Sequence, residues 1–168
     1  MVAVITVLRR FYRRVPFLPN ERVMLIMSNA HKTAIGRNKP SAPVRALDKA
    51  GLLIGKMLDF GCGRGRDACE YGMESYDPHF QPVMPKGLFD TIVCNFVLNV
   101  IESSAERRAV VADIRSRLVP GGCAYVTVRT DHKRLNGYTK IGTWQGRIEL
   151  DEPIVGKGSG YTTYKIQN

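Results

Sequence analysis

The chain has 168 residues, of which 44% are hydrophobic and 24% charged, and its formal net charge is +10. This length and composition are typical of one soluble globular domain with a real core. No apolar run reaches the ~18 residues of a membrane-spanning helix, and the four cysteines form no C-x-x-C pair. We therefore expect buried thiols rather than disulfides or a zinc site, and a cytoplasmic protein.

The positive charge is concentrated near the N-terminus. Residues 1–50 carry ten Lys and Arg against Glu21 and Asp48, whereas the rest is nearly neutral. Residues 1–26 include a β-branched run and two prolines, and Met27 resembles a natural start, so we expect a basic, disordered appendage (1–26) before a single domain (27–168). Two interpretations stay open: an idle solvated leader, or a contact for an anionic partner such as nucleic acid.

Periodicity and turn residues predict alternating helices and strands from residue 44 onward. A short helix closed by Gly51 precedes a buried strand, and Gly72 closes the next helix. The loop 78–88 holds three prolines. The predicted elements of this part are a helix 44–50, strands 56–60 and 73–77, a helix 66–71 and an apolar strand 89–98.

The second half begins with a capping box, because Ser103 stands three residues before Glu106. Apolar residues at helical spacing follow, and Pro120-Gly-Gly122 is expected to end that helix. Strands are predicted at 123–129, 148–150 and 161–166, with a hairpin loop at 156–160. The alternation of strands and helices predicts a Rossmann-like α/β fold, with a mostly parallel sheet and flanking helices.

A glycine-rich turn, Asp59-Phe-Gly61-Cys-Gly63-Arg-Gly65, lies between a predicted strand and a predicted helix. Glycines let the backbone turn sharply and approach a ligand closely. The spacing differs from the G-x-G-x-x-G fingerprint of dinucleotide sites. Asp77 ends the next strand, where an acid binds ribose hydroxyls in such units. Together these features predict a site for an adenosine-containing cofactor.

The same segments carry a family resemblance. Met57–Gly65 resembles motif I of the class I S-adenosylmethionine-dependent methyltransferases, and Tyr76-Asp77-Pro78 stands where that superfamily has its ribose-binding acid. The segments 89–102 and 118–122 resemble its fourth strand and the turn before its fifth. The resemblance covers about residues 56–130. It implies a reduced version of the fold, because the loop 78–88 leaves little room for the usual third strand and its helix.

A narrower resemblance connects the chain with the methyltransferase family associated with DNA phosphorothioation systems. The segments 31–37, 40–45, 61–65, 76–78, 97–102 and 142–145 carry it. The Asn/Asp-Pro-Pro-aromatic motif of amino-methylating DNA enzymes is absent, and Asn95-Phe-Val-Leu98 stands in its place. This departure argues against methylation of exocyclic amines by the familiar mechanism.

The resemblance implies S-adenosylmethionine as cofactor, no metal, and a set of binding residues. Asp59 would order the glycine loop and contact the methionine end, and Asp77 would bind the ribose. Asn95 would hold the methionine moiety or the acceptor, or else cap the next turn, and it is the one weak candidate for a catalytic residue. The predicted cofactor-binding residues are Asp59, Gly61, Cys62, Gly63, Gly65, Asp77 and Asn95.

Other polar and aromatic residues keep two interpretations each. Lys32, Thr33, Arg37 and Arg45 either hold an anionic substrate, nucleic acid included, or belong to a solvated segment. Tyr138, Trp144, Tyr161 and Tyr164 either stack on a base or pack in the core. The segment 131–134 lines the substrate mouth or is an ordinary loop. His31, His79 and His132 are too scattered in the sequence for a metal site, and we expect them on the surface.

The sequence thus predicts an S-adenosylmethionine-dependent methyltransferase. Its basic N-terminal portion favours a nucleic-acid acceptor, and the missing Pro-Pro motif favours a small molecule or a protein. The alternative is a regulatory protein that binds the cofactor without catalysis, because the shortened elements leave the substrate-binding part in doubt.

Overall fold

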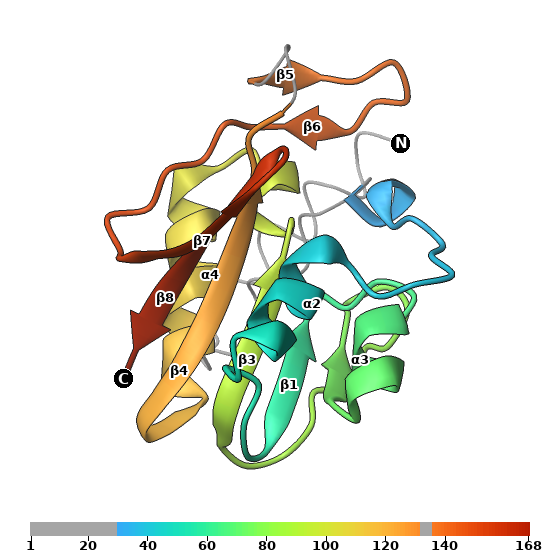
Figure 1. Cartoon of the computed structure of the whole chain (residues 1–168). Helices are drawn as coiled ribbons and strands as arrows, with labels where there is room; N and C mark the ends of the chain where they lie inside the picture. Colours follow the sequence, from blue (N-terminus) through green and yellow to red (C-terminus); the bar gives the residue numbers. More distant parts are fainter. Residues whose placement is uncertain (1–29, 132–135) are drawn as a thin grey trace, which may run out of the picture.

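The computed structural model describes residues 30–131 and 136–168 of the chain (Figure 1). A six-stranded sheet in the order β2-β1-β3-β4-β8-β7 forms its centre, and helices cover both faces. A two-stranded hairpin, β5–β6, lies beyond one end of the sheet. The elements are η2 (Ala30–Thr33), α2 (Ala42–Lys49), β1 (Met57–Phe60), α3 (Arg66–Tyr71), β2 (Glu74–Tyr76), β3 (Phe89–Asn95), η3 (Leu98–Val100), α4 (Ser104–Ser116), β4 (Leu118–Arg129), β5 (Gly137–Tyr138), β6 (Trp144–Gln145), β7 (Ile154–Gly158) and β8 (Tyr161–Gln167).

The sheet is mostly parallel, as predicted. Strands β2, β1, β3 and β4 run in one direction, and β8 is antiparallel to both of its neighbours. Residues 78–88 add no strand or helix beside β2, so β2 is an edge of the sheet. The predicted fold class is confirmed, and the prolines of this loop explain why the chain turns directly from β2 to β3.

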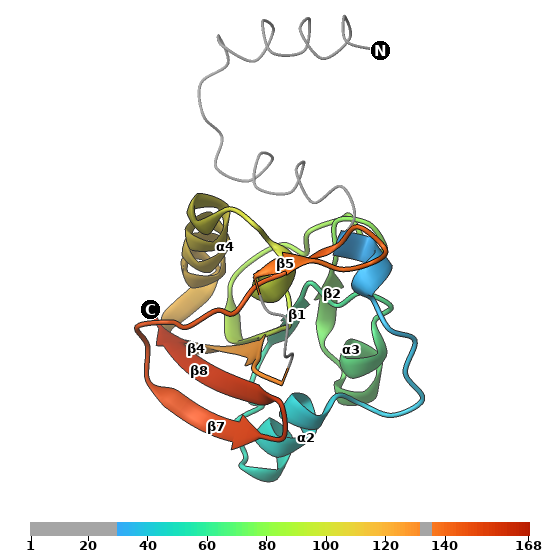
Figure 2. The same ribbon diagram turned by 90° about the horizontal axis from the view of Figure 1, so that it is seen from above.

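Two hydrophobic clusters hold the helices against the sheet. Ile92 and Cys94 of β3 pack in the cluster that includes α4, whereas Val93 between them packs in the cluster of α2 and α3. This alternation follows from the two-residue period of a strand. It also explains why the sequence of β3 is apolar throughout, because both faces are covered. Figure 2 shows α4 on one side of the sheet and α2 and α3 on the other.

Most predicted elements agree with the structure to within a few residues. Helix α3 spans the predicted range, with Gly72 as its left-handed C-cap. Ser103 caps α4, because its hydroxyl accepts a hydrogen bond from the backbone N–H of Glu106. Gly51 has a φ of +66° directly after the end of α2.

Two boundaries, one strand and one loop were predicted wrongly. The predicted hairpin loop 156–160 is the end of β7 followed by a two-residue turn. The fourth strand begins at Leu118, five residues early, because Pro120-Gly-Gly122 lies in an irregularity of the β3–β4 pairing instead of ending the helix. Strand β3 ends at Asn95, where Phe96 adopts a φ of +62°. Residues 148–150 form no strand, although Ile148 is buried in the core; β7 pairs with β8 instead, four residues further along.

The predicted appendage, residues 1–26, lies outside the described residues, as do His132 and the three residues after it. Within residues 30–131 and 136–168, no helix is long and apolar enough to cross a membrane.

Candidate functional site

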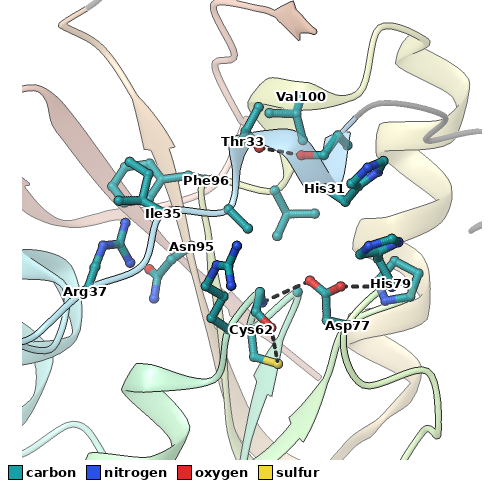
Figure 3. A pocket seen from close by; sticks show the side chains of 17 residues that line it. His31, Thr33, Ile35, Arg37, Cys62, Asp77, His79, Asn95, Phe96 and Val100 are labelled. Carbon is teal, nitrogen blue, oxygen red and sulfur yellow. Dashed lines mark hydrogen bonds between the residues drawn. The ribbon is translucent and has the colours of Figure 1, made fainter. Parts of the chain in front are cut away.

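A cavity of about 350 Å³ opens at the carboxyl ends of the parallel strands. Ligands bind at this edge in open α/β sheets. Its wall takes Gly61, Cys62 and Gly63 from the end of β1, Asp77 from the end of β2, and Asn95 from the end of β3 (Figure 3). The structure therefore brings together five of the seven predicted cofactor-binding residues.

The glycine loop is held to the end of β2 by its backbone. The N–H groups of Gly61 and Cys62 both donate to the carbonyl oxygen of Tyr76, at 2.7 and 3.0 Å. Gly61 has a φ of +76°, and a Cβ there would lie 2.3 Å from Cγ2 of Val97. Glycine is thus required at this position for two reasons, backbone conformation and close packing.

Asp77 organises the loops around the cavity. Its Oδ2 accepts a hydrogen bond from the N–H of Gly63 at 2.9 Å, and its Oδ1 accepts from the N–H groups of His79 and Phe80 at 2.9 and 3.0 Å. A carboxylate offers roughly four acceptor positions. The side chain can therefore take about one further donor from a ligand while it holds the glycine loop in place.

Asn95 has a free amide in the cavity wall. Its Oδ1 and Nδ2 are both shielded from solvent and have no hydrogen-bond partner in the described part of the chain. Unpaired buried polar atoms are rare and costly, so they indicate a missing ligand or water. The next residue, Phe96, has left-handed backbone geometry, which is uncommon for a bulky residue and concentrates at functional sites.

Asp59 and Gly65 lie behind the cavity, not in its wall. Asp59 is 3% exposed, and burial, with a smaller contribution from the Asp67 carboxylate, raises its pKa to about 8. Arg37 and the backbone N–H of Ala68 act against this shift. Gly65 is the N-cap of α3, with a φ of +74°. Both residues are thus buried next to the glycine loop and do not form the surface that a ligand would contact.

Cys62 contributes a thiol to the wall that stays protonated. Burial, together with the carboxylates of Asp59 and Asp77, raises its pKa to about 12. The thiol donates weakly to the Gly63 carbonyl oxygen, at 3.7 Å, and a hydrogen bond with the Ser75 side chain acts against the rise of its pKa. Its role in the cavity is therefore packing and not nucleophilic attack.

Residues 30–37, which we call the strap, contribute six residues to the cavity wall. Ala34 packs against the glycine loop, because a Cβ at Gly63 would lie 3.3 Å from its methyl group. The imidazole of His31 stacks on that of His79, with 4.1 Å between the ring centroids. His79 is exposed, as predicted, and His31 is half-buried. The fold brings the two rings together across 48 residues of sequence, and no sequence signal indicates this contact. The described residues contain no cluster that could hold a metal.

The other candidates lie outside the cavity wall, apart from Thr33 and Arg37 of the strap. Arg45 donates to the carbonyl oxygen of Pro40, and Lys32 is exposed on η2. Asp131 pairs with Arg129 at 2.8 Å. Tyr164 is buried in the core, whereas the rings of Tyr138 and Trp144 meet edge to face at 5.4 Å in the β5–β6 hairpin.

Solved structures resemble this one, at low sequence identity. The complex described as DhpI-SAM-HEP matches with a TM-score of 0.50 and 14% identity, over 74% of this chain and 84% of that one. The N-methyltransferase NodS from Bradyrhizobium japonicum WM9, in complex with S-adenosyl-L-homocysteine, matches with a TM-score of 0.48 and 13% identity, over 83% and 97%. A structure from work on the conversion of a disulfide bond into a thioacetal group during echinomycin biosynthesis has a TM-score of 0.43 and 22% identity, over 55% of this chain and half of that one.

No family model and no curated protein matches the sequence. At these sequence identities the likeness concerns the fold alone. We base the assignment of the fold on the match to DhpI, whose TM-score is 0.50. The chain has a Rossmann-like α/β fold with a mostly parallel six-stranded sheet.

Proposed function

We propose that the protein is a methyltransferase that binds S-adenosylmethionine in the cavity at the carboxyl ends of β1, β2 and β3. The observation that carries the proposal is the convergence of the glycine loop, the Asp77 carboxylate and the free Asn95 amide on one cavity. The fold likeness to DhpI, which was solved with SAM, supports it.

The residues present fit this cofactor. Asp77 keeps about one acceptor position for a ribose hydroxyl, beside the three backbone donors that it already holds. The loop of Gly61 and Gly63 leaves room for close approach of the methionine end. The Asn95 amide has both a donor and an acceptor free for the amino acid moiety or the acceptor.

Methyl transfer needs little chemistry from the protein. When bound, the cofactor supplies a methyl group on a sulfonium: a lone pair of the acceptor forms the new bond to carbon, and the electron pair of the broken C–S bond stays on sulfur. The chain's task is to orient the two reactants in line, and orientation alone lowers barriers by about 7–11 kcal/mol in well-aligned systems. The edge of the sheet, where β1, β2 and β3 end at one cavity, is suited to that task.

The narrower family resemblance is part of this proposal. The motif segments 31–37 and 40–45 connect the chain with the methyltransferases associated with DNA phosphorothioation. His31, Thr33 and Arg37 of the first segment line the cavity, which supports a role of that segment in ligand binding.

Calorimetry with S-adenosylhomocysteine tests the cofactor site. Wild type should bind, and Gly63→Val should lose binding, because a side chain there fills the space between loop and strap. Gly72→Val is the matched control, since Gly72 also has a positive φ, of +62°, but no atom within 4 Å of its Cβ position. Both variants carry similar backbone strain. A difference between their affinities for S-adenosylhomocysteine would therefore indicate a binding site at Gly63.

The proposal is wrong if both variants bind like wild type, or if wild type binds NAD tightly and S-adenosylhomocysteine not at all. Transfer of a labelled methyl group from S-adenosylmethionine to any acceptor separates an enzyme from a protein that only binds the cofactor.

A further inference from the structure

Two arginines of the cavity wall have no polar partner. The described part of the chain holds ten arginines, and seven of them make an ion pair or a hydrogen bond. The three without such a partner within residues 30–131 and 136–168 are Arg37, Arg64 and Arg108, and the first two line the cavity. The guanidinium of Arg64 only lies over the ring of Phe80, at 5.3 Å from its centroid.

The acids nearby do not neutralise these two charges. The Asp77 carboxylate is already hydrogen-bonded to three backbone N–H groups. Asp59 lies close enough to Arg37 for their charges to interact, but burial raises its pKa to about 8, so it carries a proton at neutral pH. The cavity wall therefore presents two exposed guanidinium groups that no residue of the described part of the chain neutralises, and both are open to an anionic ligand.

The proposed cofactor supplies only one anionic group. S-adenosylmethionine has a carboxylate, an ammonium and a sulfonium, so it can pair with one guanidinium and leaves the other free. Arg64 belongs to the glycine loop, which would hold the methionine end, so we assign that carboxylate to Arg64. Arg37 then remains for a second ligand.

Arg37 lies at the end of the cavity where a second ligand can enter. In Figure 3, Ile35, Arg37, Asn95 and Phe96 lie together, apart from Asp77 and the two histidines. Ile35 is 63% exposed, so this end faces solvent. The Arg37 guanidinium and the free Asn95 amide line the same cavity, and both offer N–H donors of the kind that bind a carboxylate or phosphate.

We propose that the methyl acceptor is a small anionic molecule, whose carboxylate or phosphate group is bound by Arg37 with the Asn95 amide beside it. The proposal rests on the proposed function and names its substrate class. One unpaired cation at the solvent-facing end of the cavity fits a small oxyanion. A nucleic-acid backbone would instead need a row of surface cations.

The first experiment titrates inorganic phosphate and, separately, acetate into protein saturated with S-adenosylhomocysteine, at constant ionic strength kept with sodium chloride. We expect measurable binding of at least one of these probes, and the two arms distinguish phosphate from carboxylate. Arg37→Gln should weaken anion binding at least tenfold and leave S-adenosylhomocysteine affinity within about twofold. Arg64→Gln should do the reverse. Arg108→Gln, which removes an exposed and equally unpaired arginine on α4, should change neither.

Several results would overturn the inference: no binding of either anion, anion binding unchanged in Arg37→Gln, or a large loss of S-adenosylhomocysteine affinity in that variant, which would make Arg37 a cofactor residue. If wild type fails to bind S-adenosylhomocysteine, the proposed function fails instead, and the same titrations without it still decide whether Arg37 binds an anion.

The second experiment uses labelled S-adenosylmethionine with cell metabolites separated by anion exchange. Label should appear in the anionic fraction and disappear with Arg37→Gln. Transfer confined to the neutral or cationic fraction, or to added DNA in a strongly salt-dependent manner, contradicts a small anionic acceptor.

Discussion

Asp77 combines two tasks that the sequence suggests separately. As the acid at the end of β2 it is the residue that we propose to bind a ribose, and as an acceptor for three backbone N–H groups it orders the loops beside the cavity. Any substitution here therefore changes the binding site and its scaffold together.

We expect Asp77→Ala to weaken S-adenosylhomocysteine binding about tenfold to a hundredfold, because a hydrogen bond to a charged group contributes roughly 1.5–3 kcal/mol. The melting temperature should also fall, since Gly63, His79 and Phe80 lose their acceptor. Calorimetry and thermal unfolding measure the two effects. Asp90→Ala is the control: Asp90 accepts from the N–H of Lys56, outside the cavity wall, so it should cost stability without affecting affinity. Unchanged affinity in Asp77→Ala would move the ribose contact elsewhere.

The buried Asp59 makes stability depend on pH. Its pKa is raised from 3.8 to about 8 in the folded protein, so between these values the folded state holds a proton that the unfolded chain has lost. Stability must then fall as the pH rises through this window, and level off above it. We expect Asp59→Asn to be more stable than wild type at pH 7, and its stability to vary less between pH 5 and pH 8.

Urea unfolding at pH 5, 6.5 and 8 measures this dependence. Asp131→Asn serves as the reference, because the Asp131 side chain is 51% exposed. A wild-type stability that increases from pH 5 to pH 8 would show that Asp59 is ionised in the folded state.

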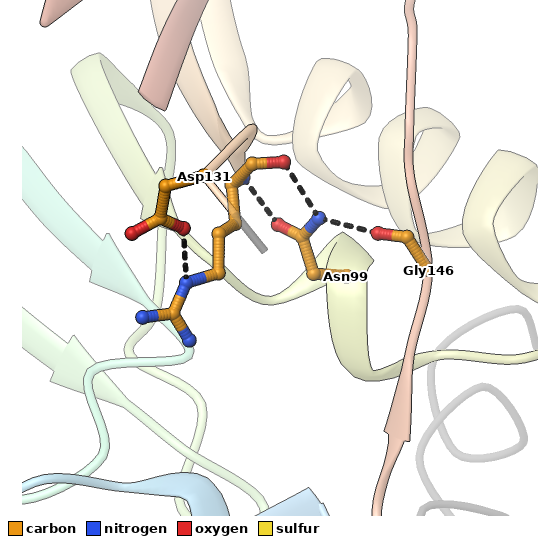
Figure 4. A network of polar contacts seen from close by, with 4 residues as sticks. Asn99, Asp131 and Gly146 are labelled. Carbon is orange, nitrogen blue, oxygen red and sulfur yellow. Dashed lines mark hydrogen bonds and ion pairs between the residues drawn. The ribbon is translucent and has the colours of Figure 1, made fainter. Parts of the chain in front are cut away.

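At the scale of elements, Asn99 connects the cavity wall with the β5–β6 hairpin (Figure 4). Its Nδ2 donates to the carbonyl oxygen of Gly146 at 2.7 Å, and its Oδ1 accepts from the N–H of Arg129 at 2.7 Å. Its own carbonyl oxygen accepts from the N–H of Gly146, also at 2.7 Å. The short helix η3 is thereby tied both to the end of β4 and to the segment after β6. Since Val100 of η3 lines the cavity, this network also holds one side of the site.

We expect Asn99→Ala to destabilise the protein by about 1–3 kcal/mol for each buried group left unpaired. Hydrogen exchange should become faster in residues 136–146, because the hairpin loses its side-chain attachment. Asn168→Ala is the matched control, as Asn168 makes a single side-chain bond, to the carbonyl oxygen of Leu118, and should cost less. Equal exchange rates in wild type and Asn99→Ala would show that the hairpin is held by other contacts.

The whole molecule is a single sheet covered on two faces, and the carboxyl ends of its parallel strands meet at one edge. The residues of the two core clusters, as described, all lie between Val44 and Ile166. The sheet contains both β2, which begins at residue 74, and β8, which ends at residue 167. Pairing between strands that are distant in the sequence therefore holds the molecule together.

We predict that a chain starting at Met27 folds and melts at nearly the same temperature as the full chain, because the sheet and both clusters, as described, use residues after 41. Thermal unfolding of the two chains tests it, and their S-adenosylhomocysteine affinities should also agree. A drop of several degrees would show that residues 1–26 contribute to the domain.

The sequence by itself determined the parts of the protein that depend on local rules. The glycines at 61, 63 and 65, the acid at 77 and the capping serine at 103 act through neighbours a few residues away, so the glycine loop and the main helices and strands up to residue 129 could be predicted. The β5–β6 hairpin and β7 were not predicted. The strand at 148–150 was predicted wrongly because burial of Ile148 gives the same signal as pairing, and only a neighbouring strand distinguishes them.

Only the tertiary structure decided which residues share the cavity. It brought Ala34 of the strap against the glycine loop and stacked His31 on His79. It also placed Arg37 and the Asn95 amide, both without a polar partner among the described residues, in the wall of the same cavity. These contacts join segments that are separated by tens of residues, and their geometry depends on the packing of the whole sheet. No periodicity or spacing along the chain encodes them, because each segment taken alone is equally compatible with a solvated loop.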